Sequence, residues 1–70
     1  MEMRSYDIQK GTGKKEWTVI IDVVDLEGGG AIAHYYIDGR QIGRVHVPPG
    51  VVTDEEKYVK ERYERMELGE

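Results

Sequence analysis

Three side chains with complementary chemistry recur along the middle of this chain. Asp22, His34 and Arg44 supply a carboxylate, an imidazole and a guanidinium, and each lies in a separate segment with strand-like alternation. Aligned on neighbouring strands, they form one row, in which the carboxylate favours the charged imidazole and the arginine can hold an anion. The row is either a small polar, pH-sensitive site or a cross-strand charge row that fixes register at about 0.2–1 kcal/mol per pair. We favour the second interpretation.

The residue types needed for most catalytic sites are scarce. The chain has no cysteine, and its only serine, Ser5, lies near the N-terminus, where chains tend to fray. Nucleophilic catalysis needs a rigidly held nucleophile beside a base. Two histidines, His34 and His46, are too few for most zinc sites unless carboxylates or a second subunit complete the set. We therefore expect no enzyme, no metal and no cofactor.

A cluster of lysines surrounds two glycines near the N-terminus. Lys10, Lys14 and Lys15 flank Gly11 and Gly13, but the spacing differs from the phosphate-binding loop of nucleotide-binding proteins, and a strand follows instead of a helix. One hypothesis is binding of single-stranded nucleic acid, in which these lysines contact phosphates while a sheet supplies a stacking platform. Its residues are Lys10, Lys14, Lys15, Tyr36 and Arg44. A solvated turn is the simpler interpretation.

Length and composition narrow the class of protein further. The chain has 70 residues, of which 39% are hydrophobic, and a net charge of −4. One domain with a thin core is the limit at this length. The acidic balance argues against a large nucleic-acid footprint. No apolar run is long enough to cross a membrane, and the absence of cysteine is typical of a cytoplasmic protein.

The elements follow from turn residues and hydrophobic period. Val and Ile dominate the middle of the chain, and glycine- or proline-rich turns divide it. Connections this short favour antiparallel neighbours. The predicted fold is α+β, a four-stranded antiparallel meander followed by one C-terminal helix packed on one sheet face. The strands are expected at about 3–9, 16–26, 31–37 and 41–47, and the helix at about 54–67.

The helix prediction depends on a change of period after the two prolines. Thr53 and Glu56 have the spacing of a capping box, and Gly69 is placed to end the helix. Four residues fall on one side at helical spacing: Tyr58, Val59, Tyr63 and Met66. This stripe is narrow, so the helix can cover only one face of the sheet. Arg62 interrupts the stripe and is expected to reach Glu55 or a partner chain.

Strand alternation sorts the sheet side chains into two sets. The first is almost wholly apolar and is expected beneath the helix. The second is mixed and comprises Ile20, Asp22, Val24, Ile32, His34, Tyr36, Ile42, Arg44 and His46. Keeping both sets intact requires Ala33 opposite Val45 and Tyr35 opposite Gly43, and we predict a three-residue loop at Asp38-Gly39 to maintain it.

The mixed set carries the functional prediction. A solvated sheet face is usually polar, whereas this one has five aliphatic or aromatic members. Such a patch is typical of an interaction surface. We therefore expect a homodimer, formed through sheet faces or through an edge strand, that acts as a small regulator or inhibitor and has no membrane contact. The alternative is that the N-terminal strand or residues 48–52 fold back over the patch.

Overall fold

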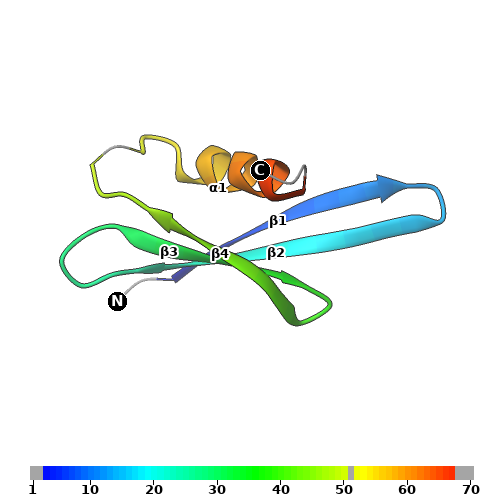
Figure 1. Cartoon of the computed structure of the whole chain (residues 1–70), viewed down its shortest axis with the longest axis horizontal. Coiled ribbons are helices and arrows are strands. Elements are labelled where there is room, and N and C mark those ends of the chain that lie inside the picture. Colours follow the sequence, from blue (N-terminus) through cyan, green and yellow to red (C-terminus); the bar gives the residue numbers. More distant parts are fainter. Residues whose placement is uncertain (1–2, 51, 68–70) are drawn as a thin grey trace.

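The computed structural model describes residues 3–50 and 52–67, which form one sheet and one helix (Figure 1). Their order along the chain is four strands and then the helix, as the sequence predicts. The elements are β1 (Met3–Thr12), β2 (Lys15–Asp25), β3 (Ala31–Ile37), β4 (Arg40–Val47) and α1 (Glu55–Glu67). The strands are antiparallel neighbours in the order β1-β2-β3-β4, so the predicted meander is confirmed.

The first hairpin is longer than the sequence suggested. Thr12 pairs with Lys15, so β1 and β2 run to either side of a turn made by Gly13 and Lys14. Residues 11–16 are all exposed. The hairpin extends beyond the rest of the molecule, as Figure 1 shows, and it contributes to a longest dimension of 43 Å. We call this exposed tip, residues 11–16, the arm. Pairing between its two strands holds it together, since it lies away from the core.

The helix covers one face of the sheet. The buried core is formed by alternate residues of β2, β3 and β4 together with two residues of α1. Its members are Val19, Ile21, Val23, Ala31, Ala33, Tyr35, Val45, Val47, Val59 and Tyr63. Tyr35 is fully buried and donates a hydrogen bond of 2.6 Å to the Val59 carbonyl. Its ring stacks on Tyr63 at a centroid distance of 6.1 Å. Tyr35 thus fixes the helix to the centre of the sheet.

The β3–β4 hairpin has the predicted register, but a two-residue turn and a β-bulge produce it instead of the predicted loop. Tyr35 lies opposite Gly43 and Ala33 opposite Val45, as expected. The expected three-residue loop is wrong: Ile37 pairs with Arg40 around a two-residue Asp38-Gly39 turn. Both turn residues have positive φ, 52° and 76°, as the favoured hairpin turn requires. A β-bulge follows, in which Ile42 is an extra residue of β4 between the partners of Tyr36 and Tyr35. Because of this extra residue, the β4 side chains after the bulge lie on the predicted faces of the sheet.

The helix begins one residue later than the capping box implied. Asp54 is the N-cap, because its Oδ1 accepts a hydrogen bond of 3.1 Å from the Lys57 amide. Asp54, not Thr53, directly precedes the helix and caps it, so the predicted Thr53–Glu56 box is wrong. A carboxylate cap next to Glu55 and Glu56 complements the helix dipole. The predicted stop at Gly69 lies outside the described residues.

Candidate interaction face

The side of the sheet opposite the helix carries the mixed set of side chains. We call it the open face and define it by eight residues of the three C-terminal strands: Ile20, Asp22, Val24, Ile32, His34, Tyr36, Arg44 and His46. Ile20 is 38% exposed, and Val24, Ile32 and Tyr36 are each partly exposed. Within residues 3–50 and 52–67, neither the N-terminal strand nor the segment after β4 covers this face, because β1 lies in the sheet and Val52 packs against the core.

A polar row crosses the middle of the open face. Ser5, Asp22, His34 and Arg44 are consecutive partners across the four strands, so the predicted alignment of the last three is confirmed. Asp22 Oδ1 accepts a hydrogen bond of 2.9 Å from Ser5 Oγ. The Gln41 amide nitrogen lies 3.3 Å from His34 Nδ1. Asp22 and His34 thus each bond to a third residue instead of to each other, which favours a register-fixing row over a small polar, pH-sensitive site.

Two apolar pairs flank this row on the central strands. Val24 lies opposite Ile32 on one side of the row, and Ile20 lies opposite Tyr36 on the other. The Tyr36 ring is tilted against His34 at a centroid distance of 6.5 Å. The open face therefore has an apolar centre divided by one polar stripe. Aliphatic and aromatic side chains of this kind gain free energy when a partner removes them from water.

Ile42 was predicted to belong to this set, and the bulge gives it a separate environment. It is 44% exposed and lines a hollow with Ile37, Asp38 and Arg40 at the end of the β3–β4 hairpin. Ile37 packs against the core on the helix side. For this reason we leave Ile42 out of the open face.

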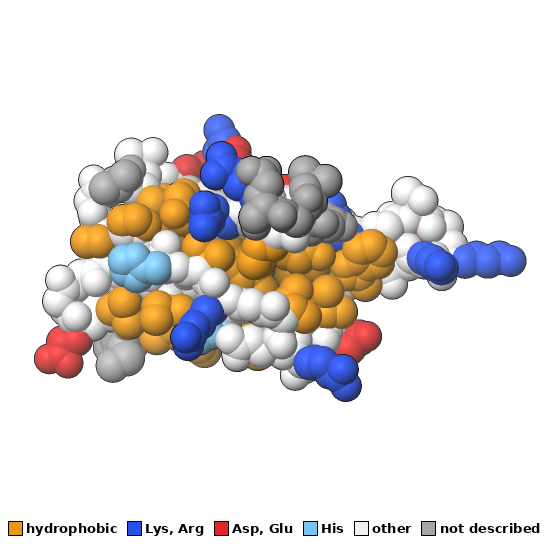
Figure 2. Space-filling model, viewed as in Figure 1, with side chains coloured by type: hydrophobic (Ala, Val, Ile, Leu, Met, Phe, Trp, Pro, Cys, Tyr) orange, Lys and Arg blue, Asp and Glu red, His pale blue; other side chains and the backbone are white. Residues whose placement is uncertain are grey.

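The residues of the nucleic-acid hypothesis are distributed over different parts of the molecule. Lys10 pairs with Glu64 of the helix at 2.9 Å, which places it on the helix side. Lys14 and Lys15 lie at the hairpin turn, where Figure 2 shows basic side chains at the far tip of the arm. Tyr36 and Arg44 lie on the open face. The five residues do not form one continuous surface.

Sequence reasoning missed a charged cluster that joins the sheet to the helix. Arg4 of β1 donates to both oxygens of Glu55, at 2.6 and 2.8 Å, and to both oxygens of Asp25, at 3.2 and 2.6 Å. Tyr6 Oη donates to Glu55 at 2.7 Å. The hydrogen bonds from Arg4 lower the pKa of Glu55 and of Asp25, and the bond to Glu55 raises the pKa of Tyr6. Because 51 positions separate Arg4 from Glu55, no local pattern signals the contact.

Arg62 had been expected to reach Glu55 or a partner chain. Glu55 is instead held by Arg4 and Tyr6. Arg62 is exposed on the helix. Arg62 is not among the described partners of Glu55, so the first alternative is wrong.

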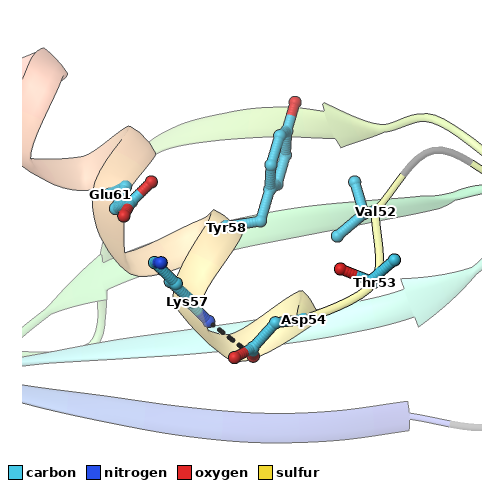
Figure 3. Close-up of a pocket in the computed structure, with 6 residues that line it drawn as sticks. All are labelled: Val52, Thr53, Asp54, Lys57, Tyr58 and Glu61. Carbon is cyan, nitrogen blue, oxygen red and sulfur yellow. Dashed lines mark hydrogen bonds between the residues drawn. The ribbon is translucent and has the colours of Figure 1, made fainter.

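A shallow hollow lies where the chain enters the helix. Its lining is Val52, Thr53, Asp54, Lys57, Tyr58 and Glu61, shown in Figure 3. The dashed line there is the capping bond from the Lys57 amide to Asp54, so this carboxylate already has a structural role. Val52 and Tyr58 both pack against the core. The hollow is thus explained by the local packing of the helix entry.

Across the described part of the chain, no three His, Asp or Glu side chains come together as possible metal ligands. Among the same residues, no helix has the length and hydrophobicity needed to cross a membrane.

Comparison with known proteins gives no relative. No protein family, curated protein sequence or solved structure matches this chain significantly.

Proposed function

We propose that this protein is a small non-enzymatic interaction module that binds a second copy of itself through the open face and acts as a regulator or inhibitor by binding. The observation that carries the proposal is the apolar content of both central strands on a side that the helix does not cover. Ile20 is 38% exposed, although its neighbours Val19 and Ile21 are fully buried. Antiparallel sheets with one solvated side normally place polar residues there.

The size of the domain supports the same proposal. A chain of 70 residues buries a smaller fraction of its surface than a larger domain does, and it has no cysteine to form the disulfide bonds that strengthen many small domains. The ten residues of the buried core all belong to the layer between sheet and helix. A second copy on the open face adds a second apolar layer, which compensates for the thin first one.

Two substitutions on the open face test the proposal. Ile20→Glu changes a side chain that is already 38% exposed, so the single chain keeps its fold. Ile32→Glu changes the more central position opposite Val24 and is expected to give a monomer of much lower stability. Thr12→Glu at the exposed hairpin tip adds the same charge away from the face and serves as the matched control.

Sedimentation velocity at micromolar concentration is the measurement, with circular dichroism as a check on folding. We expect the unaltered chain and Thr12→Glu to be dimers, and a folded Ile20→Glu chain to be a monomer. A strictly monomeric unaltered chain contradicts the proposal. So does an Ile32→Glu chain whose stability and association are unchanged.

Binding of single-stranded nucleic acid is the alternative. It is supported by Tyr36 beside His34, since aromatic side chains on a sheet can stack bases. It is weakened by the separation of the lysines from this face. Titration with labelled oligonucleotides at low salt distinguishes the two functions: binding that falls steeply with salt and is lost on Tyr36→Ala supports the alternative.

A further inference from the structure

The open face has halves of opposite charge. On the β1–β2 side it is bordered by Asp7 and contains Asp22, while on the β3–β4 side it contains Arg44 together with His34 and His46. The boundary between the halves runs between β2 and β3, parallel to the strands. Two such faces therefore attract or repel each other according to how they are turned when they meet.

Two orientations stack one copy on another with aligned strands and with the two-fold symmetry that is usual for homodimers. With the axis perpendicular to the strands, each strand lies over its own copy, and Asp22 meets the partner's Asp22. With the axis parallel to the strands and between β2 and β3, β2 lies over β3 of the partner. Asp22 then meets the partner's His34 and lies diagonal to the partner's Arg44.

The apolar residues fit the parallel axis equally well. Ile20 and Tyr36 pair within one sheet, as do Val24 and Ile32, and each pair spans the boundary between β2 and β3. A rotation about that boundary therefore places Ile20 on the partner's Tyr36 and Val24 on the partner's Ile32. Sheets packed face to face in this way keep their strands within about 30° of each other. Charged and apolar groups thus both find complementary partners.

We infer that the homodimer is a face-to-face sandwich whose two-fold axis runs parallel to the strands, between β2 and β3; this inference rests on the proposed self-association through the open face. One consequence is directional. An axis parallel to the strands preserves their direction, so both β1–β2 hairpins project from the same end of the dimer. Each arm extends well past the body of its own chain (Figure 1). The two Lys14 turns are then neighbours, whereas the perpendicular axis places them at opposite ends.

The distance between the two arms separates these arrangements. Lys14 is eight residues from Asp22, at the middle of the face. At about 3.3 Å per residue, the perpendicular axis separates the two tips by on the order of 50 Å. The parallel axis separates them by the spacing of stacked sheets, about 10 Å, by about 10 Å sideways because each turn lies about one strand spacing from the axis, and by the divergence caused by twist, which together give less than about 30 Å.

The experiment uses the absence of cysteine in this chain. Lys14→Cys introduces a single exposed thiol for a nitroxide label, far from the open face, and pulsed electron–electron double resonance measures the distance between two labels. We expect a main distance below about 30 Å that disappears when labelled chains are diluted with unlabelled ones.

The possible failures are distinguishable. A dimer by sedimentation with a label distance near 50 Å overturns the parallel axis and leaves the proposed self-association intact. A monomer by sedimentation, with no dipolar signal, overturns both. A dimer whose association is unchanged by Ile20→Glu, with a distance of any length, places the interface elsewhere and also overturns the inference.

Discussion

Arg4 of the edge strand β1 holds both carboxylate oxygens of Glu55, the first residue of α1, at 2.6 and 2.8 Å. The same guanidinium holds Asp25 at the end of β2, so one side chain joins two strands to the start of the helix. Together with the Tyr35 bond to Val59, this contact fixes the helix over one face of the sheet. The helix leaves the other face of the sheet uncovered (Figure 1), and this is the face that we propose binds a second copy.

Replacing Glu55 tests the contribution of this cluster to stability. Glu55→Gln keeps the shape of the side chain but removes the charge that accepts from Arg4 and Tyr6. We expect the free energy of unfolding to fall by about 1 kcal/mol, since the group is only partly shielded from solvent. Urea denaturation measures it. Glu64→Gln breaks only the more exposed pair with Lys10 and should cost about 0–0.5 kcal/mol; equal losses in both variants contradict the prediction.

Acid should weaken the folded state through the same cluster. Arg4 lowers the pKa of Glu55 and of Asp25 below their ordinary values near 4. Their contribution is complete above about pH 4 and is lost as the pH falls through the lower folded values. Thermal melts between neutral pH and pH 2 should therefore show a falling melting temperature below about pH 4. A double variant, Glu55→Gln with Asp25→Asn, should show a shallower fall, and an unchanged slope argues against this origin.

Alkaline conditions should act through Tyr35. Burial raises the pKa of its phenol to about 12. A phenol with a raised folded pKa contributes stability that is complete below about pH 10, the ordinary value, and is lost as the pH rises toward 12. Tyrosinate absorbance should show an ionisation near pH 12 that coincides with unfolding and is distinct from that of Tyr6, whose pKa is also raised by its bond to Glu55. Tyr35→Phe should remove that step and cost about 0.5–1.5 kcal/mol for the lost bond to Val59; persistence of the late step assigns it to another tyrosine.

Gly43 and Met66 should be energetically coupled. A Cβ added at Gly43 lies 3.3 Å from Met66 Sδ, so the helix side chain occupies the space that this glycine leaves. Gly43→Val should destabilise the fold by about 1–3 kcal/mol by overpacking. Adding Met66→Ala should recover part of that loss, and a double-mutant cycle by urea denaturation measures the coupling. Strictly additive effects contradict direct contact.

Deleting Ile42 should preserve the sheet. The two-residue turn already pairs Ile37 with Arg40, and the bulge adds Ile42 before Gly43. Its removal joins the two halves of the β3–β4 ladder without a shift, so Val45 and Val47 stay in the core. Deletion of Arg44 is the comparison: it keeps Val45 and Val47 in the core only if the bulge is lost, which puts Ile42 in the place of Gly43 opposite Tyr35, where a side chain meets Met66, so it should destabilise the fold. Amide spectra report both outcomes, and a folded Arg44 deletion with an unfolded Ile42 deletion reverses the assignment.

Periodicity predicted most of the fold because it reflects a local rule. Alternation along β2, β3 and β4 identified the buried set, and the requirement to keep that set on one side gave the correct partner for Tyr35. The local turn signal at Asp38-Gly39 conflicted with that register. The chain satisfies both through the bulge at Ile42, a compromise that depends on how twist and packing balance at one point.

The contacts that position the helix were beyond sequence reasoning. Arg4 looks like an ordinary exposed residue of an alternating strand, and its role arises only when the end of β2 and the start of α1 approach it together. The position of the N-cap was also beyond what the sequence alone could predict. Thr53 and Asp54 are both good capping residues, and the path of the chain after its two prolines selects Asp54.

Sedimentation equilibrium of the unaltered chain, over about 1 to 100 µM, tests the central claim most directly, because these concentrations span the affinities of many specific protein complexes. Self-association through the open face predicts a mass approaching twice the 8.0 kDa of one chain, and a return to the single-chain mass on Ile20→Glu. A mass of 8.0 kDa at every concentration contradicts it.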